Sequence, residues 1–305
     1  MIYTLRHLTT YRYARPVHFA RCGLRLRLTD DEGQTVLAST LTISPEPRHR
    51  TERRDHFGLD VTSIIIDTPH TELRVEALSR VRVERPSMPA PETGPAWERI
   101  RDEALRSRSL APDAPIHYLF PSPRVSLVPD VTDYARSSFP SGRSALGGAY
   151  DLMQRIRRDF RFDAKATSVR TPLEEAFALR AGVCQDFAHI MIAGLRGLGI
   201  PSAYVSGYLR TIPPAGQPRL RGADASHAWV SVWCGDGWIG LDPTNGIAMC
   251  DDHIVVARGR DYTDVSPIDG IVSSSGAQKL KVEVDVIPDG EPMPEATVTV
   301  EAERV

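Results

Sequence analysis

The chain has 305 residues, enough for one large domain or two ordinary ones. Hydrophobic residues make up 41% and charged residues 25%, a composition typical of soluble globular proteins that excludes a disordered or collagen-like chain. The 37 Lys and Arg residues nearly balance the 39 Asp and Glu residues, so the formal net charge is -2. This balance gives no overall electrostatic reason to bind nucleic acid or an anionic membrane.

The N-terminal sequence Met-Ile-Tyr-Thr-Leu-Arg-His lacks the apolar run and small-residue cleavage site of a signal peptide. No segment approaches the ~18 consecutive apolar residues that a membrane helix needs. The four cysteines show no Cys-x-x-Cys spacing, which argues against a structural zinc site, and they are too few to cross-link a chain of this size. We therefore expect a cytoplasmic protein without a membrane segment.

Residues 1–85 have the pattern of short β-strands. Apolar and polar residues alternate there, as in half-buried strands, and turn residues separate the runs. This spacing predicts a small antiparallel β-sandwich. The arginine- and histidine-rich segment 48–54 is interpreted as a solvated loop. The alternating runs are 22–28, 35–43, 60–67 and 73–83.

The proline-rich segment 85–94 cannot continue a sheet and marks the end of this first domain. Helical spacing follows, from Trp97 to Leu105 and again from 146 to 160. Because the linker is short and stiff, and the stripe around Trp97 and Leu105 needs cover, we expect the β-domain to dock on the core. Near the C-terminus, residues 279–287 and 297–301 are predicted to form a strand pair.

Cys184 is the first candidate for a chemical role. Apolar residues from Phe187 to Leu198 repeat at helix spacing, and Gly199 and Pro201 end the pattern, so Cys184 falls in the first turn of a buried helix. Gly182 is expected to turn the chain sharply into this helix through backbone angles closed to other residues. The helix dipole and free N–H groups at this position favour the nucleophilic thiolate. Taken alone, Cys184 fits an inert buried cysteine better than a catalytic one, since cysteine is among the residue types most commonly buried.

A downstream hairpin offers the partners that a nucleophilic thiol requires. Residues 225–233 have the alternating side-chain pattern of a strand. Residues 234–237 are predicted to form a tight loop, and 238–242 the return strand. If Trp233 pairs with Trp238, His227 lies diagonal to Asp242 on one face, where a carboxylate reaches an imidazole. Such a pair supplies a base for the thiol and a carboxylate that orients the base.

These motifs together resemble the bacterial transglutaminase-like proteins, a family of proposed cysteine proteases. The resemblance rests on residues 182–189, 199–201, 226–229 and 241–245, on 251–254 and 259–262 after them, and on the N-terminal region with its Asp-Thr-Pro-His run at 67–70. It covers nearly the whole chain. It implies that Cys184 is the nucleophile, His227 the general base and acid, and Asp242 the orienting carboxylate.

The resemblance implies an α+β protein in which a papain-like transglutaminase core follows a small β-sandwich. In the core, a helix with the cysteine packs on an antiparallel sheet with the histidine and aspartate. We divide the chain into an N-terminal β-sandwich (1–85), a linker and helical connector (86–140), the catalytic core (141–272) and a C-terminal strand segment (273–305).

The expected activity is acyl transfer from an amide through a Cys-His-Asp triad, without a metal or organic cofactor. Hydrolysis of a peptide or amide is favoured, because water is always present. Protein-glutamine transamidation is one alternative, and a catalytically silent peptide-binding protein or a structural interaction module is another. The family also suggests a partner of the peptide-ligase type. The substrate and the oligomeric state are not predicted.

Other residues near the motifs have weaker assignments. Gln185 is a candidate oxyanion donor, either itself or through the neighbouring Cys184 N–H. Asp186 is expected to pair locally or to line the cleft, and Trp229 to pack in the core or stack on substrate. A metal site from Cys184, Asp186 and His189 is disfavoured because the side chains diverge around a helix. His253 is read as a supporting residue or a turn cap. The remaining cysteines, interpreted as structural and without acid–base partners, are Cys22, Cys234 and Cys250.

Overall fold

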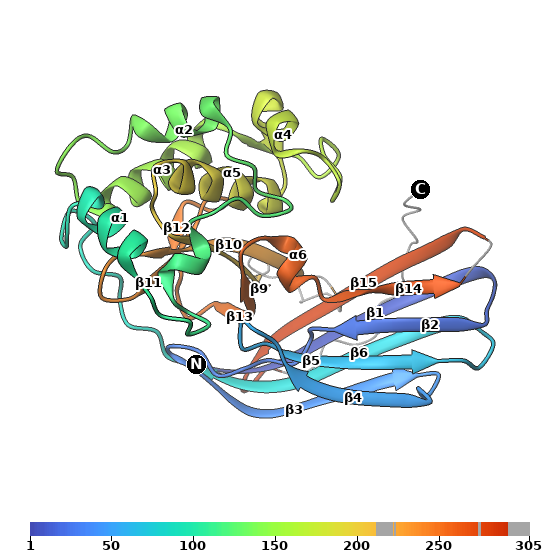
Figure 1. Cartoon of the computed structure of the whole chain (residues 1–305). Coiled ribbons are helices and arrows are strands. Elements are labelled where there is room, and N and C mark those ends of the chain that lie inside the picture. Colours follow the sequence, from blue (N-terminus) through green and yellow to red (C-terminus); the bar gives the residue numbers. More distant parts are fainter. Residues whose placement is uncertain (212–221, 223, 274–275, 292–305) are drawn as a thin grey trace.

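Two four-stranded antiparallel sheets form a β-sandwich in the computed structural model, which describes residues 1–211, 222, 224–273 and 276–291 (Figure 1). One sheet has the strand order β15-β1-β6-β3 and the other the order β14-β2-β5-β4. The predicted N-terminal β-sandwich is thus present. Its N-terminal strands are β1 (Ile2–Val17), β2 (Phe19–Leu24), β3 (Gln34–Ser44), β4 (His49–Arg54), β5 (Asp60–Ile66) and β6 (His70–Val83).

The C-terminal part of the chain completes this sandwich. β15 (Gln278–Pro288) pairs along its whole length with residues Tyr3 to Tyr13 of β1, and β14 (Ile268–Ser273) pairs with β2. The expected division therefore differs from the structure, since 268–288 belong to the same layers as 1–85. An unpaired β1 would expose a long row of backbone donors and acceptors, which the returning strands satisfy. Residues 297–301, the second half of the predicted strand pair, lie outside the described residues.

The segment 48–54 is an edge strand rather than the solvated loop that we expected. All six residues of β4 are exposed, and the strand pairs with β5 alone. Its arginines reach carboxylates nearby, with Arg50 3.0 Å from Glu52 and Arg54 3.2 Å from Asp60. The exposed charges explain both the loop-like sequence and how the edge avoids pairing with another chain.

The core is a five-stranded antiparallel sheet of order β12-β11-β10-β9-β13 with helices on it. The long helix α5 packs against β10 and β9 in the middle of the sheet, and α2, α3 and α4 surround α5 (Figure 1). The strands are β9 (Ser202–Leu209), β10 (Ala225–Trp233), β11 (Trp238–Asp242), β12 (Ile247–Ala248) and β13 (His253–Gly259). The helices are α1 (Trp97–Arg106), α2 (Pro129–Arg136), α3 (Ala145–Asp159), α4 (Leu173–Leu179), α5 (Cys184–Gly197) and the short α6 (Tyr262–Val265). Three short elements complete the core, namely the 3-10 helix η1 (Pro115–Tyr118) and the strands β7 (Arg161–Phe162) and β8 (Ala181–Gly182).

The β-sandwich docks on the core, as predicted. Tyr3 and Val83 of the sandwich share one buried hydrophobic cluster with Tyr208 and Ile254 of the core sheet. The Gln34 side chain bonds both backbone groups of Val255, at 2.9 and 2.8 Å. Part of the reason for expecting this docking was wrong, since Leu105 is 54% exposed. The helix α1 buries Ile100 and Ala104 and packs on α3 of the core.

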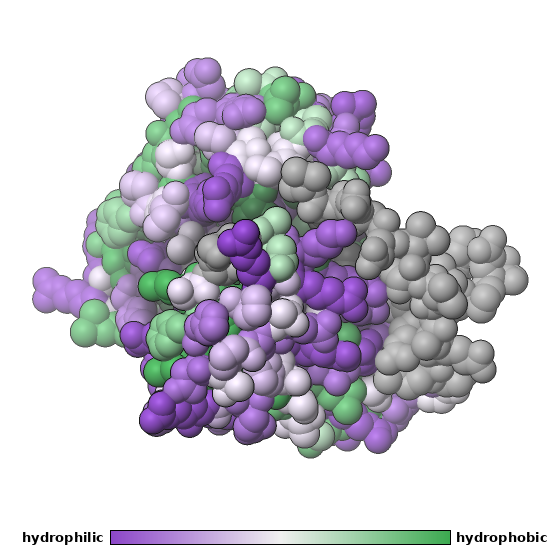
Figure 2. Space-filling model, turned by 90° about the vertical axis from the view of Figure 1, so that its right-hand side faces the viewer, coloured by the Kyte–Doolittle hydropathy of each residue, from purple (hydrophilic) through white to green (hydrophobic). Residues whose placement is uncertain are grey.

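Hydrophilic and hydrophobic residues are interspersed over the face shown in Figure 2, as expected for a composition with 25% charged residues. Within the described residues, no helix is long and apolar enough to cross a membrane.

Candidate active site

Cys184 is the first residue of α5, as the helix pattern predicted. The helix start is fixed by Asp186, whose Oδ2 accepts the backbone N–H of Val183 at 2.8 Å and the Thr167 hydroxyl at 2.6 Å. An acidic side chain that folds back on the residue before a helix stabilises the first turn. Asp186 thus pairs locally, as expected, and the position of the thiol is fixed by its neighbours.

Gly182 is required at this turn for a reason other than the one expected. Its φ is not positive, and the left-handed residue is Arg180, with φ 50. A Cβ on Gly182 would lie 2.5 Å from Oδ2 of Asp186, so a side chain there would displace the carboxylate that caps α5. The glycine provides space rather than conformational freedom.

The first backbone N–H groups of α5 are available to a ligand. Those of Cys184 and Gln185 have no acceptor among the described residues, because the first N–H groups of a helix have no partner within it. They lie beside the thiol at the positive end of the helix dipole. Either group can stabilise an oxyanion that forms on a carbonyl attacked by Cys184.

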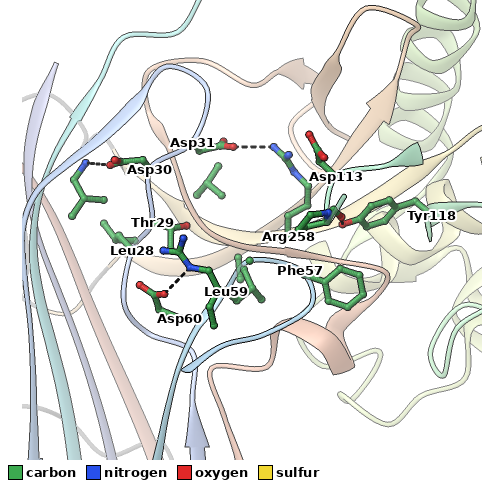
Figure 3. A pocket seen from close by; sticks show the side chains of 16 residues that line it. Leu28, Thr29, Asp30, Asp31, Phe57, Leu59, Asp60, Asp113, Tyr118 and Arg258 are labelled. Atoms are coloured by element: carbon green, nitrogen blue, oxygen red, sulfur yellow. Dashed lines mark hydrogen bonds and ion pairs between the residues drawn. The ribbon is translucent and has the colours of Figure 1, made fainter. Parts of the chain in front are cut away.

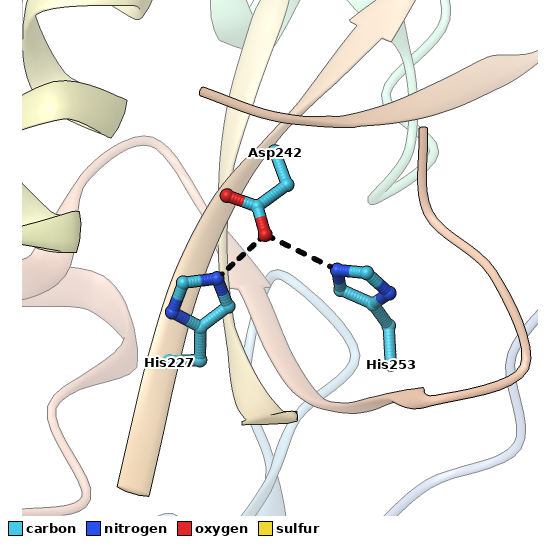
Figure 4. Close-up of side chains that lie close together, drawn as sticks. All are labelled: His227, Asp242 and His253. Atoms are coloured by element: carbon cyan, nitrogen blue, oxygen red, sulfur yellow. Dashed lines mark hydrogen bonds and ion pairs between the residues drawn. The ribbon is translucent and has the colours of Figure 1, made fainter. Parts of the chain in front are cut away.

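The hairpin that presents the histidine has the predicted register. Trp233 pairs with Trp238, and the Cys234 N–H bonds the Gly237 carbonyl to close the loop. This pairing brings His227 of β10 and Asp242 of β11 together, with His227 Nε2 2.8 Å from Asp242 Oδ2 (Figure 4). The imidazole donates this hydrogen bond, since an ionised carboxylate can only accept.

Asp242 is completely buried, and its hydrogen bonds favour the ionised form of its carboxyl group. Oδ1 accepts the backbone N–H groups of Thr244 at 2.9 Å and Asn245 at 3.2 Å. Oδ2 accepts the Asn245 amide at 2.7 Å in addition to His227. Burial alone would raise the pKa of Asp242, but the hydrogen bonds from His227, His253 and Asn245 outweigh it and lower the pKa well below its usual range.

His227 lies between this carboxylate and the thiol. Burial disfavours its protonated form, but hydrogen bonds to Asp242 and then Cys184 outweigh burial and raise the pKa of His227 to about 10. Nε2 is engaged by Asp242, so Nδ1 is the nitrogen left for Cys184. The arrangement therefore has the order thiol, imidazole, carboxylate that a thiol nucleophile requires.

His253 forms a second contact with the same carboxylate, a role that the sequence left open. Its ring is fully buried, and its Nε2 lies 3.4 Å from Oδ2 of Asp242 (Figure 4). Its Nδ1 accepts the backbone N–H of Cys250 at 3.2 Å and faces the Cys250 thiol at 3.4 Å. His253 is thus both a supporting residue and a turn cap.

The interpretation of Cys250 as a cysteine without an acid–base partner was wrong. Its thiol is exposed, and the hydrogen bond to His253 lowers its pKa. For the other two structural cysteines, burial has the opposite effect and raises the pKa of Cys22 to about 11 and of Cys234 to about 12. The sequence spacing Cys250-x-x-His253 was the signal that could have indicated the contact.

Asn245 was not recognised from the sequence. It follows Asp242 by three residues, in the turn after β11, and this spacing lets its amide fold back on the carboxylate.

Trp229 was expected either to pack in the core or to stack on a substrate, and the structure agrees only with core packing. It is fully buried with Val205 and Val255, so it packs in the core and offers no face to a substrate.

One group of side chains in the described part of the chain has the spacing of metal ligands. It consists of His227, Asp242 and His253, whose ligand atoms lie within 4.8 Å of one another. These atoms already bond to each other, because His227 and His253 both donate an imidazole proton to Asp242. Cys184, Asp186 and His189, the disfavoured candidates, do not form such a group.

A cavity at a different place in the fold is separate from these side chains. It has a volume of about 450 Å³ and lies between the sandwich and the core, beside Phe57 and Tyr118 (Figure 3). Four of its charged side chains form pairs, Asp31 with Arg258 at 3.2 Å and Arg54 with Asp60 at 3.2 Å. A smaller cavity begins at Gln185, one residue after the thiol.

Comparison with known proteins identifies the family. Residues 3–82 match the bacterial transglutaminase-like N-terminal region, and residues 133–243 match the transglutaminase-like superfamily. An uncharacterized protein of Mycobacterium tuberculosis is 38% identical over 295 residues, covering 94% of this chain and 92% of its own. The chain belongs to the bacterial transglutaminase-like family. A relative from Mycobacterium leprae, also uncharacterized, is 34% identical over 280 residues, covering 92% of this chain and 96% of its own.

A solved structure of another protein has the same fold over nearly the whole length of this chain. A proposed cysteine protease from Cytophaga hutchinsonii superposes with a TM-score of 0.72, covering 97% of this chain and 94% of its own. Its sequence identity is 19%, so the likeness concerns the fold alone. The expected α+β architecture, with a transglutaminase-like core after a β-rich domain, is confirmed.

Proposed function

We propose that the protein is a transglutaminase-like cysteine peptidase or amidase that transfers an acyl group from an amide to water. The observation that carries this proposal is the position of His227, which bonds Asp242 at 2.8 Å and whose pKa is raised by both Asp242 and Cys184. A buried histidine held between a carboxylate and a thiol at a helix start has the three parts of a cysteine hydrolase.

The chemistry follows from the contacts of each group. The Cys184 thiolate attacks the amide carbonyl, and the oxyanion accepts hydrogen bonds from the N–H groups of Cys184 and Gln185. Protonated His227 gives its proton to the leaving amine, and a thioester forms. His227, now neutral, takes a proton from the water that attacks the thioester, and the C–S bond then breaks to release the acid and restore the Cys184 thiolate. Asp242 holds the ring through Nε2 and stabilises it while it is charged.

Two other functions use the same fold. In protein-glutamine transamidation, a lysine-type amine would replace water in the second step. In a catalytically silent peptide-binding protein, the cleft would hold a peptide without reaction. Hydrolysis is favoured over transamidation because water needs no acceptor site, and the complete triad favours an enzyme over a silent binder. A peptide-ligase-type partner and a cytoplasmic location remain parts of this proposal.

Alkylation by iodoacetamide at pH 6 tests the triad before any substrate is known. Cys184 should react far faster than Cys22 and Cys234, with the rate at each site followed by mass spectrometry. In His227→Ala, the rate at Cys184 should fall to that of an ordinary thiol. Cys234 is the internal control, because burial raises its pKa to about 12. Equal rates at Cys184 in wild type and His227→Ala would overturn the proposal.

Substrate and acceptor are then identified together. A library of short amides is incubated with the protein in the presence and absence of an alkyl amine, and the masses of the products are measured by mass spectrometry. Release of a free acid supports hydrolysis, and a mass gain equal to the amine supports transamidation. A Cys184→Ser variant serves as the blank, since its hydroxyl is far harder to deprotonate than a thiol.

A further inference from the structure

The smaller cavity lies beside the start of α5 and is lined by Gln185, the residue after the nucleophile. Its volume is about 240 Å³, and one wall is the first turns of α5, with Gln185 and His189. The opposite walls are the segment 122–126 and the segment 170–176. Cys184 itself does not line the cavity, but Gln185, the next residue of the helix, does, so a group that flanks an amide at Cys184 has this space nearby.

The cavity has hydrogen-bond donors without acceptors. Arg124 and Arg170 both line it, and neither guanidinium has a carboxylate or other acceptor among the described residues. The two carboxylates of the lining are already engaged. Asp186 accepts from Val183 and Thr167 as described above, and Glu174 accepts the Ser126 hydroxyl at 2.7 Å. The donors are therefore the groups left to a ligand.

A buried histidine adds a neutral donor. The His189 residue is 5% exposed, and its Nε2 accepts the backbone N–H of Tyr262 at 3.3 Å. The ring proton must then sit on Nδ1, which has no acceptor in the described part of the chain. Burial lowers the pKa of His189 to about 4, against the opposing charge of Asp261 and with the help of Arg196 and Arg124. His189 is thus a neutral donor near neutral pH.

The segment that carries Arg124 is anchored rather than loose. The Arg124 backbone N–H bonds Oδ2 of Asp261 at 2.8 Å, and Asp261 is fully buried while its Oδ1 caps α6 through Thr263 at 2.7 Å. The neighbouring Val125 is buried as well. The backbone at Arg124 is therefore already ordered before a ligand binds.

We propose that this cavity is a carboxylate subsite, which binds an acidic group of the substrate beside the scissile amide. Guanidinium groups recognise carboxylates through charge-assisted hydrogen bonds, and the N-terminal end of α5 adds a positive dipole. The carboxylate belongs either to an acidic side chain or to a free chain end. This inference rests on the proposed thiol chemistry of Cys184, whose substrate class it narrows.

Three iodoacetyl reagents of nearly equal size test the subsite. Iodoacetyl-glutamate α-amide has a side-chain carboxylate, iodoacetyl-glutamine with a free α-carboxyl group has a terminal one, and iodoacetyl-glutamine α-amide is the neutral reference. In each case the Cys184 thiolate displaces iodide, and the second-order rate constant is read by mass spectrometry. We expect one of the acidic reagents to react about tenfold faster than the reference, the ratio that about 1.4 kcal/mol of selective binding gives.

The arginine variants decide the origin of this preference. In Arg124→Gln combined with Arg170→Gln, the ratio of acidic to neutral rates should fall to about one. Arg108→Gln, an exposed arginine in a different segment, is the matched control and should keep the wild-type ratio. No preference in the wild type, or a preference that survives the double substitution, would overturn the subsite.

The result is independent of the test of the triad. The ratio is measured whether Cys184 reacts quickly or slowly, so loss of the ratio with fast alkylation refutes the subsite alone. If Cys184 is alkylated only at the rate of an ordinary thiol, the proposed chemistry is refuted. The ratio of acidic to neutral rates then still shows whether the cavity prefers carboxylates. The acidic reagent that reacts faster shows whether the subsite binds a side-chain carboxylate or a terminal one.

Discussion

Nε2 of His253 lies 3.4 Å from Oδ2 of Asp242, the same oxygen that accepts the hydrogen bond from His227. The orienting carboxylate is therefore itself oriented by a second histidine from a different strand, β13. Burial disfavours the charged form of His253, yet hydrogen bonds to Asp242 and Cys250 raise its pKa. The site is thus supported on both sides of Asp242 by rings that the core sheet fixes.

Asp242→Asn should reduce turnover strongly while the hairpin stays folded. The amide offers the His227 ring a donor as well as an acceptor, so the wrong tautomer forms, and the loss could be as large as ~10⁴-fold. The measurement is kcat with the first amide substrate found. Asp251→Asn is the matched control, because Asp251 accepts the backbone N–H of Arg85 and not a histidine proton. A loss of less than about threefold in Asp242→Asn would contradict the triad.

His253→Leu should destabilise the protein, and His253→Gln should do so less. Leucine leaves the buried Asp242 without one of its donors, at about 1–3 kcal/mol in the free energy of unfolding, whereas glutamine keeps an N–H. Urea unfolding measures both. In the folded variants, alkylation of Cys250 should slow, because His253 is the hydrogen-bond partner that lowers its pKa. Unchanged Cys250 labelling would show that the contact does not activate this thiol.

The stability that His227 contributes should be lost at alkaline pH. Its pKa rises from 6.5 to about 10 on folding, so the contribution is fully present below 6.5 and disappears as the pH rises through about 10. The melting temperature of the wild type should exceed that of His227→Gln by several degrees at pH 6, and the gap should narrow toward pH 10. A gap that is constant with pH would argue against a protonated His227 in the folded protein.

Gly182→Ala should disturb the start of α5. The new methyl group would lie 2.5 Å from Oδ2 of Asp186, so the carboxylate must leave the Val183 N–H or the helix must shift. We expect a loss of ~1–3 kcal/mol in stability, together with slower alkylation of Cys184. Gly237→Ala is the control, since a Cβ at Gly237 has no atom within 4 Å, and it should leave both measurements near the wild-type values.

Removal of residues 1–89 should prevent normal folding. It deletes β1 and β2, the partners of β15 and β14, and exposes the apolar surface around Tyr208 and Ile254 that Tyr3 and Val83 cover. Water penalises such surface by ~25 cal/mol per Å². Expression of residues 90–305 should give aggregation or a clearly lower melting temperature than the full chain. A soluble fragment with unchanged melting and Cys184 labelling would show that the core folds by itself.

The sequence alone determined the local features of the site. The helix that begins at Cys184 and the hairpin register from Trp233 to Trp238 were both predicted, because each depends on residues close together in the chain. Apolar spacing fixes which face of a helix is buried, and a short turn fixes which residues of a hairpin face each other. The pairing of His227 with Asp242 followed from that register.

Only the tertiary structure decided the features that join distant parts of the chain. The pairing of β15 with β1, the contact of His253 with Asp242 and the cavity of Arg124, Arg170 and His189 bring together residues from separate segments. No local pattern encodes such contacts, since a strand carries the same alternation whichever edge it joins. These contacts depend on how whole layers pack. The same holds for β4, whose exposed charged residues resemble a loop in the sequence and form a strand only through pairing with β5.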